Sequence, residues 1–128
     1  MFKYSAVFSG FSVNDLEKAE EFYKNVLGFS VINNPMGLIE LEIPGNNNIL
    51  IYPKPEHQPA DFTVLNIPVE NIDEAVNHLT KIGVKFERYE GEIETDKKGI
   101  CRSDGKEPNL AWFKDRAGNI ISILEEKS

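Results

Sequence analysis

The chain contains an internal repeat, and this repeat constrains the fold more than any other feature of the sequence. Residues 13–19 (VNDLEKA) return as residues 69–75 (VENIDEA) in the second half of a 128-residue chain. In both halves an alternating apolar run precedes the repeat, and a helical pattern follows it that ends in glycine, at Gly28 and at Gly83. A repeat of this size predicts two similar structural units. Such a pair usually buries one shared face, and a cleft is expected where the halves meet.

The apolar spacing predicts one amphipathic helix in each half, over residues 15–27 and over residues 72–82. Both expected helices end at a glycine, which is a common helix-terminating residue. Each is also preceded by two residues with the spacing of a capping box. These pairs are Asn14 with Glu17, and Asn71 with Glu74.

Alternating apolar residues predict strands on both sides of each helix. In the first half we expect strands at residues 6–13, 29–32, 38–43 and 48–52, and in the second half at 61–69, 84–89, 110–114 and 120–125. A long polar loop over 90–108 is expected to hold a short strand near 99–102 and to act as a lid, with Gly91 and Gly99 as flexible points. This order predicts an α+β fold of two βαβββ modules in one domain, 1–128. Module one is 3–53, the linker is 54–60 and module two is 61–126.

The composition is that of a soluble globular domain. Apolar residues make up 41% and charged residues 27% of the chain. No apolar run approaches the roughly 18 residues of a membrane span, so we expect no membrane partner. The net charge of −7 argues against nucleic acid, whose phosphates require clustered Lys and Arg. The single cysteine, Cys101, predicts a cytoplasmic protein without an internal disulfide.

Three segments resemble the vicinal oxygen chelate superfamily, which includes glyoxalase I, extradiol dioxygenases, fosfomycin-resistance enzymes and bleomycin-resistance proteins. They are residues 11–29 (FSVNDLEKAEEFYKNVLGF), the strand and helix of the second half, and residues 111–119 (AWFKDRAGN). The Phe-Tyr…Leu-Gly-Phe and Asp-x-x-Gly-Asn signatures stand in the right order, and the resemblance covers essentially the whole chain. It implies two βαβββ modules whose curved sheets surround a ligand cleft. The activity does not follow, because this fold hosts several chemistries.

Metal-dependent members of the superfamily hold a divalent ion with His and Glu side chains from four strands. Carried over position by position, the resemblance places these ligands at Phe8, Tyr52, Val64 and Ser122. Transition metals need imidazole, carboxylate or thiolate donors, and none of these four residues has one. We therefore expect no metal at this site and no cofactor.

Other metal-ligating residues are few and scattered. A metal bound elsewhere is conceivable, although solvent-facing positions are the more common role of such residues. His57 lies in the linker. The candidates elsewhere are His78 with Glu74 on the second helix, and Glu92, Glu94 and Asp96 in the long loop.

The sheet faces away from the helices are expected to line an apolar cleft with a few polar groups, as small-molecule sites do. Small side chains at Gly10 and Ser12 favour an open cleft, whereas close packing of the aromatic residues would shut it. Ile120 and Leu124 belong to the same faces. The proposed ligand-binding residues are Phe8, Gly10, Ser12, Leu50, Tyr52, Phe62, Val64, Asn66, Trp112 and Ser122.

Two functions remain open. The first is a binding protein that sequesters or senses a small, partly aromatic organic molecule. The drug-sequestering branch of the superfamily works without metal catalysis, and an acidic dimer there binds cationic antibiotics. The alternative is a glyoxalase- or dioxygenase-like lyase or oxidoreductase. It would use a rearranged metal site or a metal-free mechanism with Tyr52, Asn66 and Ser122 as polar participants. The missing ligands favour the binding protein, and exposed sheet edges predict a homodimer.

Overall fold

The computed structural model describes residues 1–103, 105 and 107–126. The chain divides into two compact units, Met1–Pro59 and Ala60–Ser128. Each unit contains one four-stranded mixed sheet and follows the order strand, helix, three strands. The predicted α+β fold of two tandem βαβββ modules is therefore confirmed. No helix formed by the described residues is long and apolar enough to cross a membrane.

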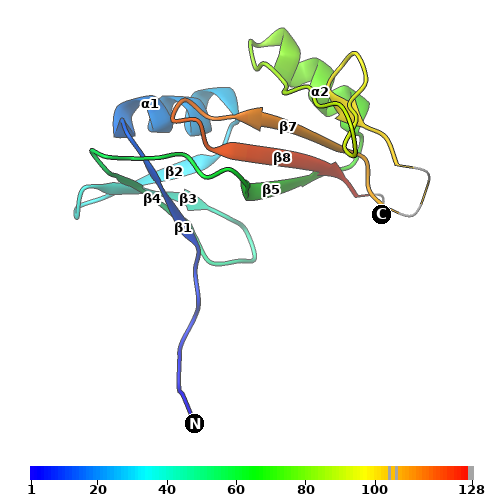
Figure 1. Ribbon diagram of the computed structural model, residues 1–128. Coiled ribbons are helices and arrows are strands. Elements are labelled where there is room, and N and C mark those ends of the chain that lie inside the picture. The colour runs from blue at the N-terminus through cyan, green and yellow to red at the C-terminus, as the bar shows by residue number, and fades with distance from the viewer. Residues whose placement is uncertain (104, 106, 127–128) are drawn as a thin grey trace. The chain divides into compact units, whose positions relative to one another are not determined.

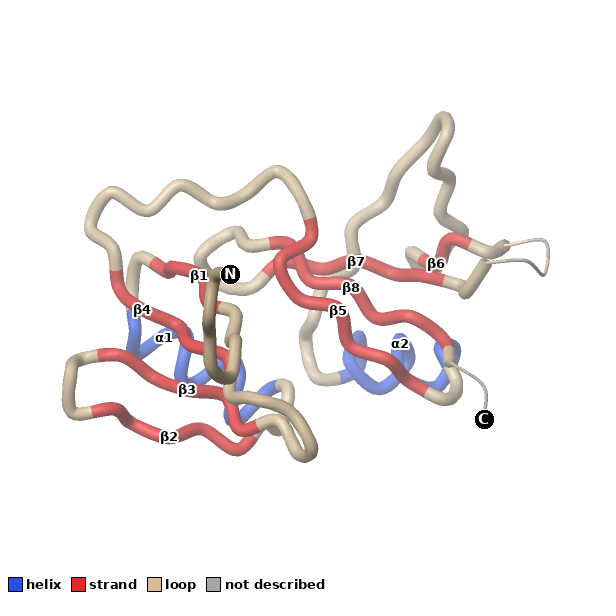
Figure 2. The backbone as a smooth tube through the Cα atoms, turned by 90° about the horizontal axis from the view of Figure 1, so that it is seen from below, coloured by secondary structure: helices blue, strands red, loops and turns tan. Residues whose placement is uncertain are grey.

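In unit 1 the strands are ordered β1-β4-β3-β2 across the sheet (Figures 1 and 2). β1 runs parallel to β4, and the other two pairs are antiparallel. A π-helical turn, η1, continues the helix α1. The elements are β1 (Gly10–Val13), α1 (Leu16–Glu21), η1 (Phe22–Val26), β2 (Ser30–Asn34), β3 (Leu38–Glu42) and β4 (Ile49–Pro53).

Alternation along the strands assigns the two faces of this sheet. The helical side carries the core, in which Tyr23 is fully buried and its ring packs against Phe11, Phe22 and Phe29. The face away from the helix, called the open face below, carries the other residues of β1 and β4, which alternate with the core residues. The buried strand residues are Phe11, Val13, Ile39, Leu41 and Ile51.

The first helix begins one residue later than its predicted cap. Asp15, not Asn14, has the extended backbone of an N-cap, and its Oδ1 accepts a hydrogen bond from the backbone N of Lys18 at 3.2 Å. The helix then widens, because Leu27 N bonds to Phe22 O, five residues back, at 3.0 Å. The predicted helix over 15–27 is thus present, but its second half is π-helical.

In unit 2 the strand order is β5-β8-β7-β6, with β5 parallel to β8 and the remaining pairs antiparallel. Helix α2 begins after Asn71, whose Oδ1 accepts from Glu74 N at 3.0 Å as predicted. Ile72 and Val76 of α2 are buried with residues of β7 and β8. The elements are β5 (Thr63–Val69), α2 (Ile72–Lys81), β6 (Ile100–Cys101), β7 (Leu110–Lys114) and β8 (Ile120–Glu125).

Two predicted strands differ from the structure. The strand expected over 6–13 begins only at Gly10, because the segment before it joins β4 through a single backbone bond, from Leu50 N to Ser9 O. The strand expected over 84–89 is reduced to one bridge between Phe86 and Phe113, beside a bond from Glu87 N to Trp112 O. That segment shares the edge of β7 with β6, which leaves room for little more than one pair.

The Asp-x-x-Gly-Asn signature is the turn between β7 and β8. The Asp115 side chain is buried, and its Oδ1 accepts from the backbone N of Ala117 and of Asn119, each at 2.9 Å. Its Oδ2 accepts from Asn119 Nδ2 at 3.0 Å. The turn fixes the register of the two strands, so that Trp112 lies directly across from Ser122.

Candidate ligand-binding site

Four of the predicted binding residues share the open face of the unit-1 sheet. Gly10 pairs with Leu50, and Ser12 pairs with Tyr52 on the neighbouring strand. A side chain at Gly10 would stand 3.2 Å from the Leu50 carbonyl oxygen, so the glycine permits a close approach of β1 to β4. The Tyr52 side chain is 43% exposed and accessible to a ligand.

Phe8 was expected in the first strand, but β1 begins only at Gly10. The Phe8 side chain is 60% exposed. It lines a pocket of about 390 Å³ together with Leu50 and Glu40. The Glu40 carboxylate accepts from Asn34 Nδ2 at 2.9 Å and from Asn48 Nδ2 at 3.1 Å. These two hydrogen bonds favour the charged form and lower the pKa of Glu40, whose carboxylate is in any case ionised at neutral pH.

His57, which the sequence placed in the linker, is bonded to a predicted binding residue. Its Nδ1 lies 2.7 Å from Ser12 Oγ, and both residues are half-buried. The linker turns back on itself, with His57 N bonded to Lys54 O. No local pattern indicates this contact, because it depends on how the linker folds across β1.

In unit 2 three predicted residues form a row across the open face of the sheet. Asn66, Ser122 and Trp112 are neighbours on β5, β8 and β7. Ser122 is buried, and its hydroxyl is 2.6 Å from Asn66 Oδ1, to which it donates. A ligand that accepts a hydrogen bond from Ser122 must therefore compete with Asn66, whereas a ligand that donates to Ser122 Oγ need not. Val64 occupies a register shift between Thr63 and Leu65, where the strand is irregular.

A pocket of about 740 Å³ lies within unit 2, a volume suited to a drug-sized molecule. Trp112 and Phe62, both predicted, line it together with Tyr89, which no sequence pattern indicated. The Tyr89 and Trp112 rings meet edge to face with centroids 5.5 Å apart. The remaining walls are three carboxylate residues and three uncharged residues: Asp61, Glu90 and Glu92, with Thr63, Ile93 and Ile120.

Tyr89 also fixes the loop that carries two of these carboxylates. Its backbone N donates to Thr95 Oγ1 at 2.9 Å, and Thr95 N donates to Tyr89 O at 3.0 Å. Burial, reinforced by the charge of Glu87, raises the pKa of the Tyr89 phenol, although Lys114 opposes the shift. The phenol is therefore protonated at neutral pH and can donate a hydrogen bond.

The acidic character of this pocket could not be read from the sequence. Glu90 and Glu92 belong to a polar loop whose charges are ordinarily solvated, and Asp61 is the first residue of the expected strand over 61–69. All three line the same pocket, beside a loop that the bonds between Thr95 and Tyr89 close. The single local signal is aromatic alternation, which selected Phe62 and Trp112.

Among the described residues, no group of three or more His, Cys, Asp or Glu side chains is placed to hold a metal ion. The residues that the resemblance assigns to the metal-ligand positions are Phe8 and Tyr52 in unit 1 and Val64 and Ser122 in unit 2, and none of the four has an imidazole, carboxylate or thiolate group. Asp96 of the long loop is engaged by Arg102 and by the backbone of Lys98 and Ile100. The side chains of Phe8, Tyr52, Val64 and Ser122 do not fit a divalent transition metal.

The sequence and fold identify the family. The model of the Glyoxalase/Bleomycin resistance protein/Dioxygenase superfamily matches residues 7–123, and the chain belongs to this superfamily. No curated protein sequence matches the chain.

Solved structures of three proteins illustrate the likeness. A fosfomycin resistance protein from Listeria monocytogenes has a TM-score of 0.72 at 15% identity, with 98% of this chain and 96% of that chain covered. An antibiotic binding protein from a Streptomyces species has a TM-score of 0.70 at 19% identity, covering 99% of each chain. A superfamily member from Sphaerobacter thermophilus has a TM-score of 0.67 at 25% identity, covering 97% and 98%. The first two are similar in fold only.

Proposed function

We propose that this protein binds a small, cationic, partly aromatic organic molecule without a metal, and so sequesters or senses it. The observation that carries the proposal is the acidic, aromatic pocket of unit 2. Trp112, Phe62 and Tyr89 offer ring faces, which attract cations as well as apolar surface. Asp61, Glu90 and Glu92 supply negative charge beside those rings. The antibiotic binding protein of similar fold supports a binding role.

The net charge of the chain acts in the same direction. At −7, the protein attracts cations over a distance set by the ionic strength. Close contact with the rings then determines which cation stays bound, because apolar contact is short-ranged. A cation with a flat apolar body is therefore favoured over a small metal ion, which would find no oriented set of donors.

The test compares three probes of one shape and different charge: N-methylquinolinium, quinoline and quinoline-2-carboxylate at pH 8. Trp112 is the single tryptophan of the chain, so its fluorescence reports binding directly. We expect the cation to bind most tightly, quinoline more weakly and the carboxylate least. Equal affinities for the cation and the anion would refute the proposal, as would the absence of binding by all three.

Two pairs of variants locate the site. Glu92→Gln should weaken binding of the cation, whereas Glu94→Gln, in the same loop but not lining the pocket, should leave it unchanged. Trp112→Ala should weaken binding more than about tenfold by calorimetry, because a buried aromatic ring contributes about 2 kcal/mol. Asn66→Ala should cost less, because Asn66 does not line this pocket and the loss is at most one hydrogen bond of about 1 kcal/mol.

A metal-free enzyme is the second candidate, and the contact between Ser12 and His57 favours it. An imidazole nitrogen 2.7 Å from a hydroxyl is placed to exchange a proton with it, as general acid–base catalysis requires. Substrate screening of the wild type against Ser12→Ala tests this candidate. Loss of turnover in the variant with retained ligand binding would support it, and no turnover of glyoxalase or dioxygenase substrates by the wild type would count against it.

We also propose that the protein is a cytoplasmic homodimer that binds neither nucleic acid nor membranes. Exposed apolar residues before β1 and open strand edges support self-association. The single cysteine and the acidic charge support the remaining statements.

A further inference from the structure

A second pocket in unit 2 differs from the first in charge and position. It has a volume of about 560 Å³ and lies between α2 and the segments that follow it. The side chains of Val76, Val84 and Phe86 form its apolar part, and all three are buried. Asn77 and Thr80 of α2 add neutral polar groups. Nothing in the proposed binding of a cation uses these residues.

Cations are concentrated in this pocket. Lys81, Lys85, Arg88, Lys97 and Lys98 line it, although the whole chain has only 14 Lys and Arg residues against 21 Asp and Glu. Within the described part of the chain, no Asp or Glu lines the pocket. On a protein of net charge −7, this makes the pocket a local region of positive potential.

Most of these cations are available to a ligand. Lys98 bonds to Asp73, with its Nζ 3.2 Å from Oδ1. By contrast, Lys81, Lys85, Arg88 and Lys97 form no ion pair with any described residue. The C-terminal end of α2 carries a partial negative charge that opposes an anion. That opposition is reduced because the last carbonyls of α2 accept backbone bonds from residues 82–84.

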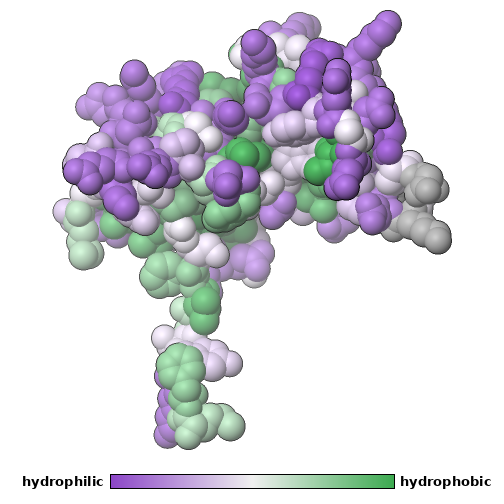
Figure 3. Space-filling model, in the orientation of Figure 1, coloured by the Kyte–Doolittle hydropathy of each residue, from purple (hydrophilic) through white to green (hydrophobic). Residues whose placement is uncertain are grey.

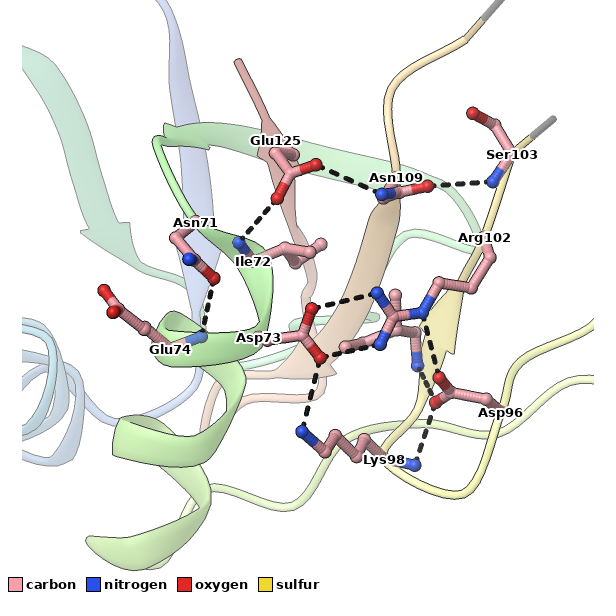
Figure 4. A network of polar contacts seen from close by, with 11 residues as sticks. Asn71, Ile72, Asp73, Glu74, Asp96, Lys98, Arg102, Ser103, Asn109 and Glu125 are labelled. Atoms are coloured by element: carbon pink, nitrogen blue, oxygen red, sulfur yellow. Dashed lines mark hydrogen bonds and ion pairs between the residues drawn. The ribbon is translucent and has the colours of Figure 1, made fainter. Parts of the chain in front are cut away.

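The wall of the pocket is held in place by an ion-pair network, which Figure 4 shows from close by. Arg102 binds the Asp73 carboxylate through two nitrogens, at 2.9 and 2.7 Å, and reaches Asp96 through Nε at 3.1 Å. Asp96 in turn accepts from the backbone N of Lys98 and of Ile100. The turn that carries Lys97 and Lys98 is therefore attached to α2, and the cations stand over a fixed surface.

From this geometry we infer a second ligand site, which takes a small organic anion: a phosphate monoester or a carboxylate joined to an apolar ring. The charged group is met by the unpaired cations, and the ring contacts the apolar floor of Val76, Val84 and Phe86. Both parts are needed, because exposed lysines alone bind an inorganic anion weakly and without selectivity.

The test is an NMR titration of the ¹⁵N-labelled full chain with phenyl phosphate, benzoate, phenol and inorganic phosphate. We expect phenyl phosphate or benzoate to shift the amides of residues 76–88 and 97–99 along a saturable curve. Phenol and inorganic phosphate should each bind more weakly than the ring-bearing anions. Equal affinity for phenol would overturn the inference, and so would shifts that are absent or spread over unrelated surfaces.

A double variant, Lys85→Gln with Arg88→Gln, should weaken phenyl phosphate binding about fivefold, since each exposed charge contact changes affinity about two- to threefold. The matched control is Lys18→Gln with Lys24→Gln, on α1 and η1 of unit 1, which removes the same charge elsewhere. It should leave the affinity nearly unchanged. An equal loss of phenyl phosphate affinity in the control would show that only the net charge of the protein matters, and it would overturn the proposed site.

Discussion

At the scale of single residues, Gly99 and Gly91 have similar backbones and different roles. Both have a positive φ, +92° at Gly99 and +102° at Gly91, which L-residues rarely adopt. A Cβ at Gly99 would lie 2.8 Å from Phe86 Cβ and 3.2 Å from the Glu87 carbonyl, whereas a Cβ at Gly91 meets nothing within 4 Å. The missing side chain of Gly99 therefore allows two segments to pack, and its part as a flexible point of a lid stays a prediction.

This difference predicts unequal effects of alanine on stability. Gly91→Ala should lower the free energy of unfolding by about 1 kcal/mol through backbone strain alone. Gly99→Ala should lower it by about 3 kcal/mol, because overpacking adds to the same strain. Urea denaturation of both variants and the wild type measures the difference. Equal losses would mean that the contact with Phe86 carries no energy.

At the scale of elements, local patterns located most helices and strands of the described residues. The bounds of β7 and β8 agree with the alternating runs, and α2 follows its apolar stripe and its cap at Asn71. The strand predictions that differ from the structure depend on which strands pair with each other. Whether residues 6–9 or 84–89 form a strand depends on a distant partner, and β6 already pairs with part of the edge of β7. Residues 104 and 106 of the expected lid lie outside the described residues.

The candidate site was partly predictable for the same reason. Alternation on β7 and in the expected strand over 61–69 identified Trp112 and Phe62, because a strand exposes every second residue. The contributions of Tyr89, Glu90 and Glu92 depend on the bonds between Tyr89 and Thr95, which close a loop without periodicity. Sequence periodicity contains no information about such a closure.

The link between α2 and the loop before β6 predicts a pH dependence. Hydrogen bonds from Arg102, and then from Lys98, hold the pKa of Asp73 well below its ordinary value of 3.8. A lowered carboxyl pKa stabilises the fold above the unfolded-state pKa, and this stability is lost as pH falls through the folded-state pKa. The wild type should therefore lose more stability than Asp73→Asn between about pH 5 and about pH 2.

Thermal unfolding at constant ionic strength across this range measures the effect. At neutral pH the Asp73→Asn variant should melt below the wild type, and the gap should close on acidification. Glu94→Gln, an exposed substitution in the same long loop, serves as the control and should melt in parallel with the wild type. A constant gap between Asp73→Asn and the wild type would show that the carboxylate charge is not what holds the loop.

At the scale of the whole molecule, opposite charges are separated within unit 2. The segment 84–98 contributes Arg88 and three lysines to the cationic pocket, and Tyr89, Glu90 and Glu92 to the acidic one. A chain of net charge −7 therefore has one pocket of positive and one of negative electrostatic potential. Each proposed site is expected to select its ligand by charge before apolar contact.

The N-terminal segment also bears on the behaviour of the whole molecule. Residues 1–9 are exposed and extend from the edge strand β1 (Figure 1), and the space-filling view shows apolar residues along this extension (Figure 3). The exposed fractions are 81% for Phe2, 74% for Tyr4 and 60% for Phe8. Apolar residues gathered beside a strand edge are typical of a surface that a partner covers.

We therefore expect sedimentation equilibrium to give twice the 14.5 kDa chain mass at micromolar concentration. Replacing Phe2, Tyr4 and Phe8 together by Ser should raise the dimer dissociation constant more than about tenfold, because each buried aromatic ring contributes about 2 kcal/mol. Added salt should strengthen the dimer, since it screens the repulsion between two chains of charge −7.

The control variant is Met36→Ser, at an exposed turn of unit 1. It removes apolar surface elsewhere and should leave the dimer dissociation constant unchanged. A wild type that sediments only as a 14.5 kDa species, or a triple variant that associates as strongly as the wild type, would exclude this segment as the dimer contact.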